Sequence, residues 1–528
     1  PISETARHLV DVVFSRHFPS SYAGVLVAIF FSWTIASYFT SPLRKCPGPF
    51  LARFTSLWYM YQVYNGNSHL VLEKLHQKYG PKVRIGPNLV DIDYPSIMRN
   101  VFVLNGGWLK TELYHTSSSL VNGKIVNNIF SETDPAKHRM QRNPISKLYS
   151  NSSIKGKEPL MNIVIEILCK ILEEHCVNEE NDNKGFDLGE WISLYTWDVV
   201  GMTTYSRAMG YLKSGWDFDG TLRIANKAMD YFAIVGTMPW LDKVLDKNPY
   251  WHMGPPSFGT VTKISVQRLQ DRLRGEDGDH HDFEQSDFLD QFISAADKED
   301  GKTDDNQIIS WLMINMIAGA DTTAIGIRNA LYFPLKDNKV WKRLTEEILE
   351  ADFRDQTPPP YEKVKALPYT DAVVREALRM LPGVSMSMER YVPRGGFTLP
   401  DGYVLPGGTI VGINPYVLGR NKTAYGNDAD QFRPERWLRD SEHGETDAEF
   451  KERLATMKEA DLGFGRGRHD CIGKYLGLYQ IYKVLATLIL LFEIELVHPE
   501  KEWKVTNSWF PRQEELEVRI RKRPTDRS

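Results

Sequence analysis

A glycine-rich loop with a single cysteine, FGRGRHDCIG (Phe464–Gly473), precedes a long apolar segment. The glycines allow positive φ angles and therefore a tight loop. We predict that a helix follows and runs to about residue 492, which places Cys471 at a helix N-terminus. At such a position free N–H groups and the helix dipole favour an anion and lower the pKa of a thiol. The last part of this helix, Val484–Phe492, is uncharged and apolar on all faces, too short to cross a bilayer and typical of a large core.

The other side chains of the loop suit an anionic partner beside the sulfur. Phe464 can shield the sulfur, while Arg466, Arg468 and His469 supply hydrogen-bond donors. A thiolate held in an apolar pocket is a strong axial donor to heme iron. The alternative is a glycine-rich surface loop with a buried structural cysteine.

The composition allows a large core and excludes some classes of function. The chain has 528 residues, of which 42% are hydrophobic and 25% charged. The formal net charge of -4 gives no basic field, so we expect no nucleic-acid partner. The four cysteines include no CxxC pair, and Cys169 and Cys176 would lie ~10 Å apart on a helix, too far for a disulfide. We therefore expect a reduced, cytosolic main body.

An uncharged apolar segment, Pro19–Leu43, is long enough to span a membrane, which takes ~20 residues as a helix. We predict that residues 1–45 form an N-terminal tail and one transmembrane anchor. A cleavable signal peptide is the alternative, and the missing small-x-small cleavage site argues against it. The hinge Cys46–Pro49 then begins a single large domain over residues 46–528.

Helical periods dominate this domain. A long apolar helix is expected from Asp305–Asn306 to about Lys336, and thirty residues of helix would span ~45 Å. The segment Lys82–Asp93 is typical of a β-hairpin, and residues 388–413 of short strands and turns. Acidic residues 275–306 predict surface loops around one short helix. The predicted fold class is mainly α with a small β lobe.

The cysteine loop resembles the heme-binding signature of the cytochromes P450, F-x-x-G-x-(R/H)-x-C-x-G, in every fixed position. The resemblance implies the cytochrome P450 fold and heme b (iron protoporphyrin IX) as cofactor. It makes Cys471 the metal ligand, with Phe464 beside the sulfur. His469 stands where the family usually has Arg, which keeps a propionate contact but makes its charge depend on pH.

The segment AGADTT (Ala318–Thr323) lies inside the predicted long helix, where glycine and threonine cost helix stability. The residues alone leave open a core helix whose threonines bond back to the preceding turn. The resemblance implies the oxygen-activation segment instead, with a widened helical turn. Thr322 would then hydrogen-bond the oxygen being activated, and Asp321 would pass protons inward from solvent.

Two further motifs support the heme loop in the family. Glu376 and Arg379 form an E-x-x-R pair, and Phe432–Trp437 reads FRPERW. A solvated surface pair is the ordinary alternative. The resemblance implies a buried structural network of Glu376, Arg379 and Arg436.

Three more basic residues match the family's propionate contacts: His138, Arg142 and Arg390, with ordinary surface charges as the alternative. A basic surface on the thiolate side would contact a reductase through Lys137, Arg139, Arg466 and Lys474. By resemblance, the substrate pocket would draw on Trp108–Phe130, Tyr231–Val235, Asn315, Val384–Met388 and Asn507–Phe510, which suit a hydrophobic small molecule.

The segment Gly412–Trp437 most resembles fungal microsomal members of the pisatin-demethylase-like and secondary-metabolism branches. The implied enzyme is a monooxygenase that takes electrons from NADPH–cytochrome reductase. It would sit in the endoplasmic reticulum membrane with its catalytic domain in the cytosol. Two alternatives stay open: a reductase-independent heme-thiolate isomerase or dehydratase, and a cofactor-free, membrane-tethered binding protein.

Overall fold

The structure is a computed structural model that describes residues 29, 32, 34, 36 and 38–524, with gaps at 103–106, 122, 177–184, 249, 252, 256–257, 279–280, 282–284, 299–304, 352 and 354–355. Most of the predicted membrane anchor lies outside these residues. The described chain is mainly helical with small β-sheets, which confirms the predicted fold class at that level.

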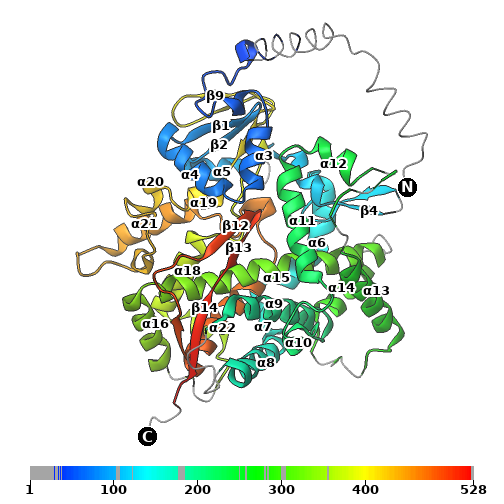
Figure 1. The fold of residues 1–528 in the computed structure, drawn as a ribbon, viewed down its shortest axis with the longest axis vertical. Coiled ribbons are helices and arrows are strands. Elements are labelled where there is room, and N and C mark those ends of the chain that lie inside the picture. Colours follow the sequence, from blue (N-terminus) through cyan, green and yellow to red (C-terminus); the bar gives the residue numbers. More distant parts are fainter. Residues whose placement is uncertain are drawn as a thin grey trace, which may run out of the picture.

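A single long helix, α15 (Asp305–Leu335), runs through the middle of the molecule and confirms the predicted long apolar helix (Figure 1). It packs against α9 (Leu188–Tyr205), α18 (Pro368–Met380) and α22 (Lys474–Leu491). Because neighbours cover it on several sides, α15 is apolar around most of its circumference. Among the described residues it is the one helix long and apolar enough to cross a membrane, and 50% of its most apolar window is buried inside the protein.

The remaining helices surround this central group. They are α3 (Leu57–Tyr64), α4 (Ser68–Tyr79), α5 (Met98–Val101), α6 (Pro135–Ser146), α7 (Asn151–Lys155), α8 (Glu158–Cys176), α10 (Tyr211–Ser214), α11 (Thr221–Gly236), α12 (Trp240–Leu245), α13 (Gly259–Arg274), α14 (Phe288–Asp297), α16 (Asn338–Glu350), α17 (Tyr361–Lys365), α19 (Pro415–Leu418), α20 (Lys422–Tyr425) and α21 (Asp447–Ala460). The short 3-10 helices are η1 (Leu51–Arg53), η2 (Pro95–Ile97), η3 (Glu112–Ser117), η4 (Lys147–Tyr149), η5 (Pro434–Trp437) and η6 (Gly467–His469).

The β lobe is built around a five-stranded sheet with the order β1-β2-β10-β7-β3. Strands β1 and β2 form the predicted antiparallel hairpin, and β10 runs parallel to β2 and antiparallel to β7. Its strands are β1 (Lys82–Gly86), β2 (Leu89–Ile92), β3 (Leu109–Lys110), β7 (Arg390–Tyr391) and β10 (Ile410–Gly412). The others are β4 (Ser119–Val121), β5 (Lys124–Val126), β6 (Phe186–Asp187), β8 (Phe397–Thr398), β9 (Val404–Leu405), β11 (Phe492–Leu496), β12 (Lys504–Ser508), β13 (Phe510–Glu514) and β14 (Glu517–Lys522).

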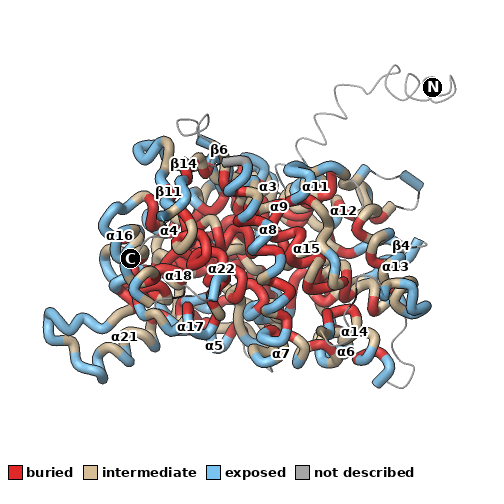
Figure 2. Tube along the Cα trace, turned by 90° about the horizontal axis from the view of Figure 1, so that it is seen from below, coloured by how far each residue is buried: buried red, intermediate tan, exposed pale blue. Residues whose placement is uncertain are grey.

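The main core follows the central helices. Figure 2 shows buried chain along α8, α9, α15 and α22, and exposed chain at the periphery in α16 and α21. A second apolar cluster fills the β lobe, and a third joins this lobe to α11 and to Trp509 between β12 and β13. In the C-terminal part of α22, Val484–Ile489 is fully buried and Leu490 and Leu491 are half-buried, which confirms the core position predicted for Val484–Phe492.

Candidate functional site

The cysteine loop connects α21 to α22 and is closed by backbone hydrogen bonds. The N–H of Cys471 donates to the carbonyl oxygen of Phe464 over 2.7 Å. Gly467 has a φ of +66°, and a Cβ at this position would lie 1.8 Å from the carbonyl oxygen of Phe102. Only glycine fits there. Helix α22 begins at Lys474, directly beyond the loop, as predicted.

The surroundings of the Cys471 thiol do not make it acidic on their own. The side chain is solvent-accessible, but neighbouring protein atoms displace enough hydration to raise the pKa of the thiol. The N–H of Gly473 and the charges of Arg142 and Lys474 act in the opposite direction. The N–H of Gly473 at the helix N-terminus lowers this pKa in the predicted direction, but desolvation outweighs the donors and cations, so the pKa of the thiol is raised overall.

Six basic side chains gather beside the cysteine loop, and we call them the basic cluster. They come from β3, α6, β7 and the loop itself. The members are Lys110, His138, Arg142, Arg390, Arg468 and His469.

Specific contacts hold the basic cluster in place. The rings of His138 and His469 lie edge to face with centroids 4.6 Å apart. Arg142 donates to the backbone and side-chain oxygens of Asp470 over 2.8 and 2.5 Å, which ties α6 to the cysteine loop. The structure thus brings together residues that are far apart in the sequence.

Mutual repulsion marks the basic cluster as a site for an anion. Burial, followed by the charges of Lys110 and Arg142, lowers the pKa of His138 to about 3. Burial, Lys110 and Arg390 also lower the pKa of His469, which favours the neutral imidazole as long as no anion is bound. Burial and the charges of Arg390 and Arg142 hold the pKa of Lys110 well below its ordinary value. An anionic group would relieve this repulsion.

Two residues beside the basic cluster were predicted only as members of the pocket segment Trp108–Phe130, with no role of their own. Lys110 is buried on β3 and donates to the carbonyl oxygen of Phe130 over 2.8 Å. Tyr114 accepts a hydrogen bond from Arg390 over 2.9 Å. The sequence signal that could have identified Lys110 is its place directly after the apolar pair Trp108-Leu109. A lysine is rarely buried unless it has a partner, so its position in an apolar segment indicates a specific role.

A small cavity lies against the basic cluster. It has a volume of about 30 Å³ and is lined in part by Arg390, Arg468 and His469. Phe102 and Trp108 form apolar parts of its wall. The cavity therefore combines cationic and apolar surfaces.

The AGADTT segment lies on α15 with regular helical geometry, and the widened turn predicted there is not observed. The hydroxyl of Thr322 donates to the carbonyl oxygen of Ala318 over 2.7 Å, which is the back-bonding expected of a core threonine. Asp321 accepts a hydrogen bond from the indole N–H of Trp197 over 3.1 Å. Burial raises the pKa of Asp321 to about 6, against the hydrogen bond from Trp197 and the charge of Arg328.

The predicted buried network around Glu376 is confirmed. Arg379 donates to both oxygens of the Glu376 carboxylate over 2.8 and 2.7 Å, and Arg436 donates to one of them over 2.8 Å. Trp437 adds an indole N–H at 2.9 Å. Arg379 also donates to the carbonyl oxygen of Gly419, so the network fixes the irregular chain that leads to the cysteine loop.

Comparison with known proteins agrees with this geometry. The family model described as Cytochrome P450 matches residues 47–517. The chain belongs to the cytochrome P450 family. It is an oxygenase-type oxidoreductase, and the family implies a heme cofactor.

Several curated cytochrome P450 proteins of fungi are similar to this chain over most of its length. The cytochrome P450 monooxygenase cfoH of Aspergillus candidus is 42% identical over 95% of this chain and 92% of its own length. The monooxygenase cicH of Emericella nidulans is 34% identical over 94% and 98%. The monooxygenase mpaDE' of Penicillium brevicompactum is 35% identical over 91% of this chain, which spans 56% of that longer protein.

Four aromatic rings form a cluster from three of the segments expected to line the substrate pocket of this cytochrome P450. Trp509 lies 5.1 Å from Phe232, 5.8 Å from Phe130 and 5.9 Å from Tyr114, measured between ring centroids. We call these four residues the aromatic cluster. The segment Val384–Met388 contacts the aromatic cluster through Met386, whose sulfur accepts a hydrogen bond from the backbone N–H of Trp509 over 3.2 Å.

Asn315, which the resemblance also places in the pocket, makes two hydrogen bonds within the helical core, and its place in the pocket stays a prediction. Its side chain donates to Thr204 over 2.8 Å and accepts from Tyr149 over 2.7 Å. The oxygen and the nitrogen of its side-chain amide are therefore both engaged within the helical core. Asn315 lies on the face of α15 that meets α9, which the sequence period did not reveal.

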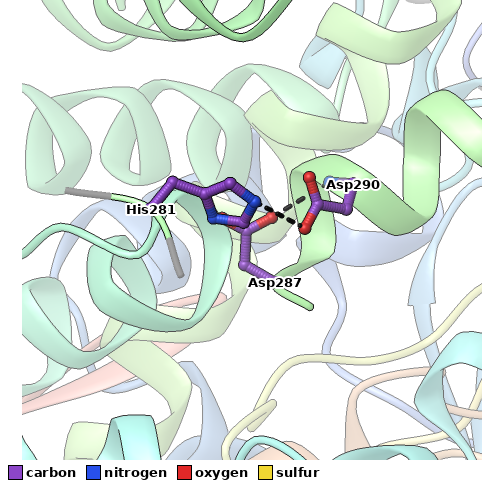
Figure 3. A group of neighbouring side chains, drawn as sticks. All are labelled: His281, Asp287 and Asp290. Carbon is purple, nitrogen blue, oxygen red and sulfur yellow. Dashed lines mark hydrogen bonds and ion pairs between the residues drawn. The ribbon is translucent and has the colours of Figure 1, made fainter. Parts of the chain in front are cut away.

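A second group of potential metal ligands in this cytochrome P450 is formed by His281, Asp287 and Asp290 (Figure 3). Arg272 already pairs with both carboxylates, over 2.8 Å to Asp287. Asp287 also accepts from the hydroxyl of Ser206 over 2.9 Å. Because an arginine neutralises these oxygens, the group is an ion-pair network that joins the start of α14 to α13 rather than a metal centre.

Proposed function

We propose that the protein is a heme-thiolate monooxygenase that oxidises a hydrophobic, aromatic small molecule in fungal secondary metabolism. Its cosubstrates would be O₂ and electrons from NADPH–cytochrome reductase. The observation that carries the proposal is the basic cluster beside the accessible sulfur of Cys471. A thiolate with basic side chains at one side would meet two needs of heme: a ligand for the iron and partners for its propionates.

The residues present fit heme b. Cys471 would bind the iron, whose positive charge favours the thiolate that the protein alone does not stabilise. His138, Arg142, Arg390 and His469 would receive the propionates. The Nδ1 atom of His469 supports this role, since it is buried and has no hydrogen-bond partner among the described residues. Phe464 would lie beside the sulfur.

Heme supplies the site at which dioxygen is activated, and the protein supplies the protons. Thr322 carries a hydroxyl that can exchange its bond to Ala318 for another acceptor. Asp321 is the adjacent carboxyl, and its raised pKa of about 6 suits a group that must both gain and lose a proton near neutral pH. We therefore assign proton delivery to Asp321 and Thr322.

The aromatic cluster supports a planar aromatic substrate. Tyr114, Phe130, Phe232 and Trp509 meet edge to face, a geometry in which a further ring can be accommodated by stacking or edge contacts. Such walls select by shape and give few polar contacts.

Residues 1–45 would anchor the domain of residues 46–528 to the endoplasmic reticulum membrane, with the domain in the cytosol. Exposed apolar side chains on neighbouring elements support a membrane-facing surface. Helix α11 packs against both α3 and α12. Four aromatic side chains here are each more than half exposed: Trp240 on α12, Trp251 beyond it, and Tyr61 and Tyr64 on α3. Tryptophan and tyrosine prefer the membrane interface.

The reductase would dock where cations surround the cysteine loop. Lys137 and Arg139 are exposed on α6, and Lys474 is exposed at the start of α22. Arg466 is less available, because it donates to the carbonyl oxygen of Glu459 over 3.1 Å. A basic surface of this kind steers an acidic partner.

Reconstituted turnover with isotopically labelled dioxygen tests the proposed function. The purified protein, reductase and NADPH are incubated with a panel of aromatic compounds in membranes. We expect one labelled oxygen atom in the product and one in water. Turnover with an organic peroxide, together with no turnover from NADPH and O₂, would instead identify a heme-thiolate isomerase or dehydratase.

A further inference from the structure

Asp321 is held by a residue from the neighbouring helix. The indole N–H of Trp197 on α9 donates to Oδ1 of Asp321 over 3.1 Å, and the Trp197 side chain is fully buried. The two helices approach closely at this level, since a Cβ at Gly319 would lie 3.2 Å from Cγ2 of Val200. Glycine in the AGADTT segment therefore lets α9 come near enough for Trp197 to reach the carboxylate.

The rest of the environment keeps Trp197 in place. Its ring meets Tyr211 edge to face, with centroids 6.3 Å apart. The adjacent carboxylate of Asp198 accepts hydrogen bonds from the backbone N–H groups of Gly210, Tyr211 and Leu212, which fixes α10 against α9. The indole has little freedom to follow a moving carboxyl group.

An indole N–H has a distinctive chemistry as the partner of a carboxyl group. It donates a hydrogen bond and accepts none, so Trp197 can stabilise the carboxylate of Asp321 but cannot relay a proton. Hydrogen bonds to an ionised acceptor are stronger than those to a neutral one. Protonation of Asp321 therefore weakens its bond to Trp197 and frees the side chain.

Two other charged groups face Asp321, and both are engaged elsewhere. Arg328, two turns further along α15, donates to the carbonyl oxygen of Gly189 over 3.1 Å. Arg512 on β13 pairs with Asp230 on α11 over 2.7 Å. Their charges favour the ionised form of Asp321, but within the part of the chain that the structure describes, Trp197 provides its direct hydrogen bond.

We propose that Trp197 is a positioning residue that holds the ionised Asp321 side chain toward α9 and releases it on protonation. The released carboxyl group then gives its proton to the hydroxyl oxygen of Thr322, which passes its own proton on. One proton enters Asp321 from the solvent side and one leaves Thr322, so the residues return to their starting state. This inference rests on the proposed function, because it assigns a role in proton delivery.

The direct test is an infrared titration of the Asp321 carboxyl group in the purified holoenzyme. The band of the protonated group is identified by its loss in Asp321→Asn. In the unaltered protein we expect a midpoint near pH 6, in line with the pKa of about 6. Trp197→Phe keeps an aromatic ring and removes the donor, and we expect the midpoint to rise by roughly one unit.

Trp311→Phe is the matched control. Trp311 also lies buried on α15, and its indole N–H donates to the carbonyl oxygen of Gln141 over 2.9 Å. Its replacement removes an equivalent bond without touching Asp321. An unchanged midpoint in Trp197→Phe, or an equal rise in Trp311→Phe, would overturn the inference. Should Trp197→Phe not fold, the benzothienyl analogue of tryptophan at this position removes only the N–H group and is expected to give the same rise.

Catalytic readouts separate this inference from the proposed function. The ratio of product formed to NADPH consumed is expected to change with pH. The pH at which this change is half complete should be roughly one pH unit higher in Trp197→Phe than in the unaltered enzyme. A pH midpoint of this ratio that does not move overturns the role in proton delivery. A shifted infrared midpoint in a protein without NADPH-driven turnover supports the positioning role and overturns the proposed function instead.

Discussion

The backbone N–H of Cys471 donates to the carbonyl oxygen of Phe464, and this bond of 2.7 Å closes the loop that precedes α22. The bond sets the direction in which the cysteine side chain leaves the backbone. It forms only because the chain between the two residues turns tightly, with positive φ angles at Gly465 and Gly467. The geometry of the candidate heme ligand thus depends on glycines that never touch the sulfur.

Gly467→Ala is expected to disrupt this loop. A Cβ would meet the carbonyl oxygen of Phe102 at 1.8 Å, and the φ of +66° is unfavourable for alanine. We expect a loss of stability of about 2 kcal/mol or more and a lower heme-to-protein ratio after purification. Gly395→Ala is the control, because a Cβ there would have no atom within 4 Å. An undiminished heme content in Gly467→Ala would contradict this account of the loop.

Glu376→Gln is expected to destabilise the whole domain. Burial alone would raise the pKa of Glu376, but Arg379 and Arg436 hold it below its ordinary value, so the carboxylate is ionised and paired. Removing its charge leaves the buried Arg379 without its carboxylate partner and leaves Arg436 with Asp428 alone, and should cost on the order of 3 kcal/mol in the free energy of unfolding.

Chemical denaturation measures the effect of Glu376→Gln. The control is Glu346→Gln on α16, where both members of the ion pair with Lys342 are exposed. We expect a change of less than about 0.5 kcal/mol in that control. Equal decreases in the free energy of unfolding in the two variants would show that the buried network stabilises the fold no more than an exposed ion pair does.

Glu389 should make stability depend on pH. Burial raises the pKa of its carboxyl group from 4.5 to about 7 in the folded protein. Between these two values the folded state binds more protons than the unfolded state, so this group's contribution to stability falls as pH rises across that window. Glu389→Gln should therefore be more stable than the unaltered protein at about pH 8, by about 3 kcal/mol, with most of the difference gone by about pH 5. Thermal unfolding of both proteins at the two pH values measures this, and a difference independent of pH would contradict it.

Charge reversal on α6 should weaken the approach of the reductase. In the double variant Lys137→Glu and Arg139→Glu, we expect the KM for reductase to rise roughly tenfold at low salt, with unchanged heme content and substrate binding. High salt should reduce the difference, because it screens exposed charges. Lys339→Glu on α16, which lies on the other side of the molecule (Figures 1 and 2), is the control and should leave this KM unchanged.

Much of the fold could be predicted from local patterns. The long α15 follows from a long apolar run, the β1–β2 hairpin from the residue pattern of Lys82–Asp93, and the buried end of α22 from a stretch that is apolar on all faces. The first three features are encoded by local sequence. The Glu376 network was predicted only through the resemblance to the family, because the spacing of Glu376 and Arg379 alone also fits a solvated surface pair.

The features that the sequence did not predict depend on tertiary contacts between segments far apart in the chain. The hydrogen bonds that the Asn315 side chain makes with Thr204 and Tyr149 join segments far apart in the sequence, so no local pattern predicts them. The basic cluster forms because β3 pairs with β7 and lies beside the cysteine loop. The place of Lys110 in this cluster therefore cannot be predicted from its own segment of the sequence. The net rise in the pKa of Cys471 could not be predicted, because desolvation depends on atoms from the whole fold.

The most direct test of the central claim is the carbon monoxide difference spectrum of the reduced protein, compared with that of Cys471→Ser. The account predicts that the unaltered protein gives the strongly red-shifted Soret band of a thiolate-bound heme, and that the variant gives no such band and no oxygenated product. A Cys471→Ser protein with the same spectrum and the same product as the unaltered chain would contradict it.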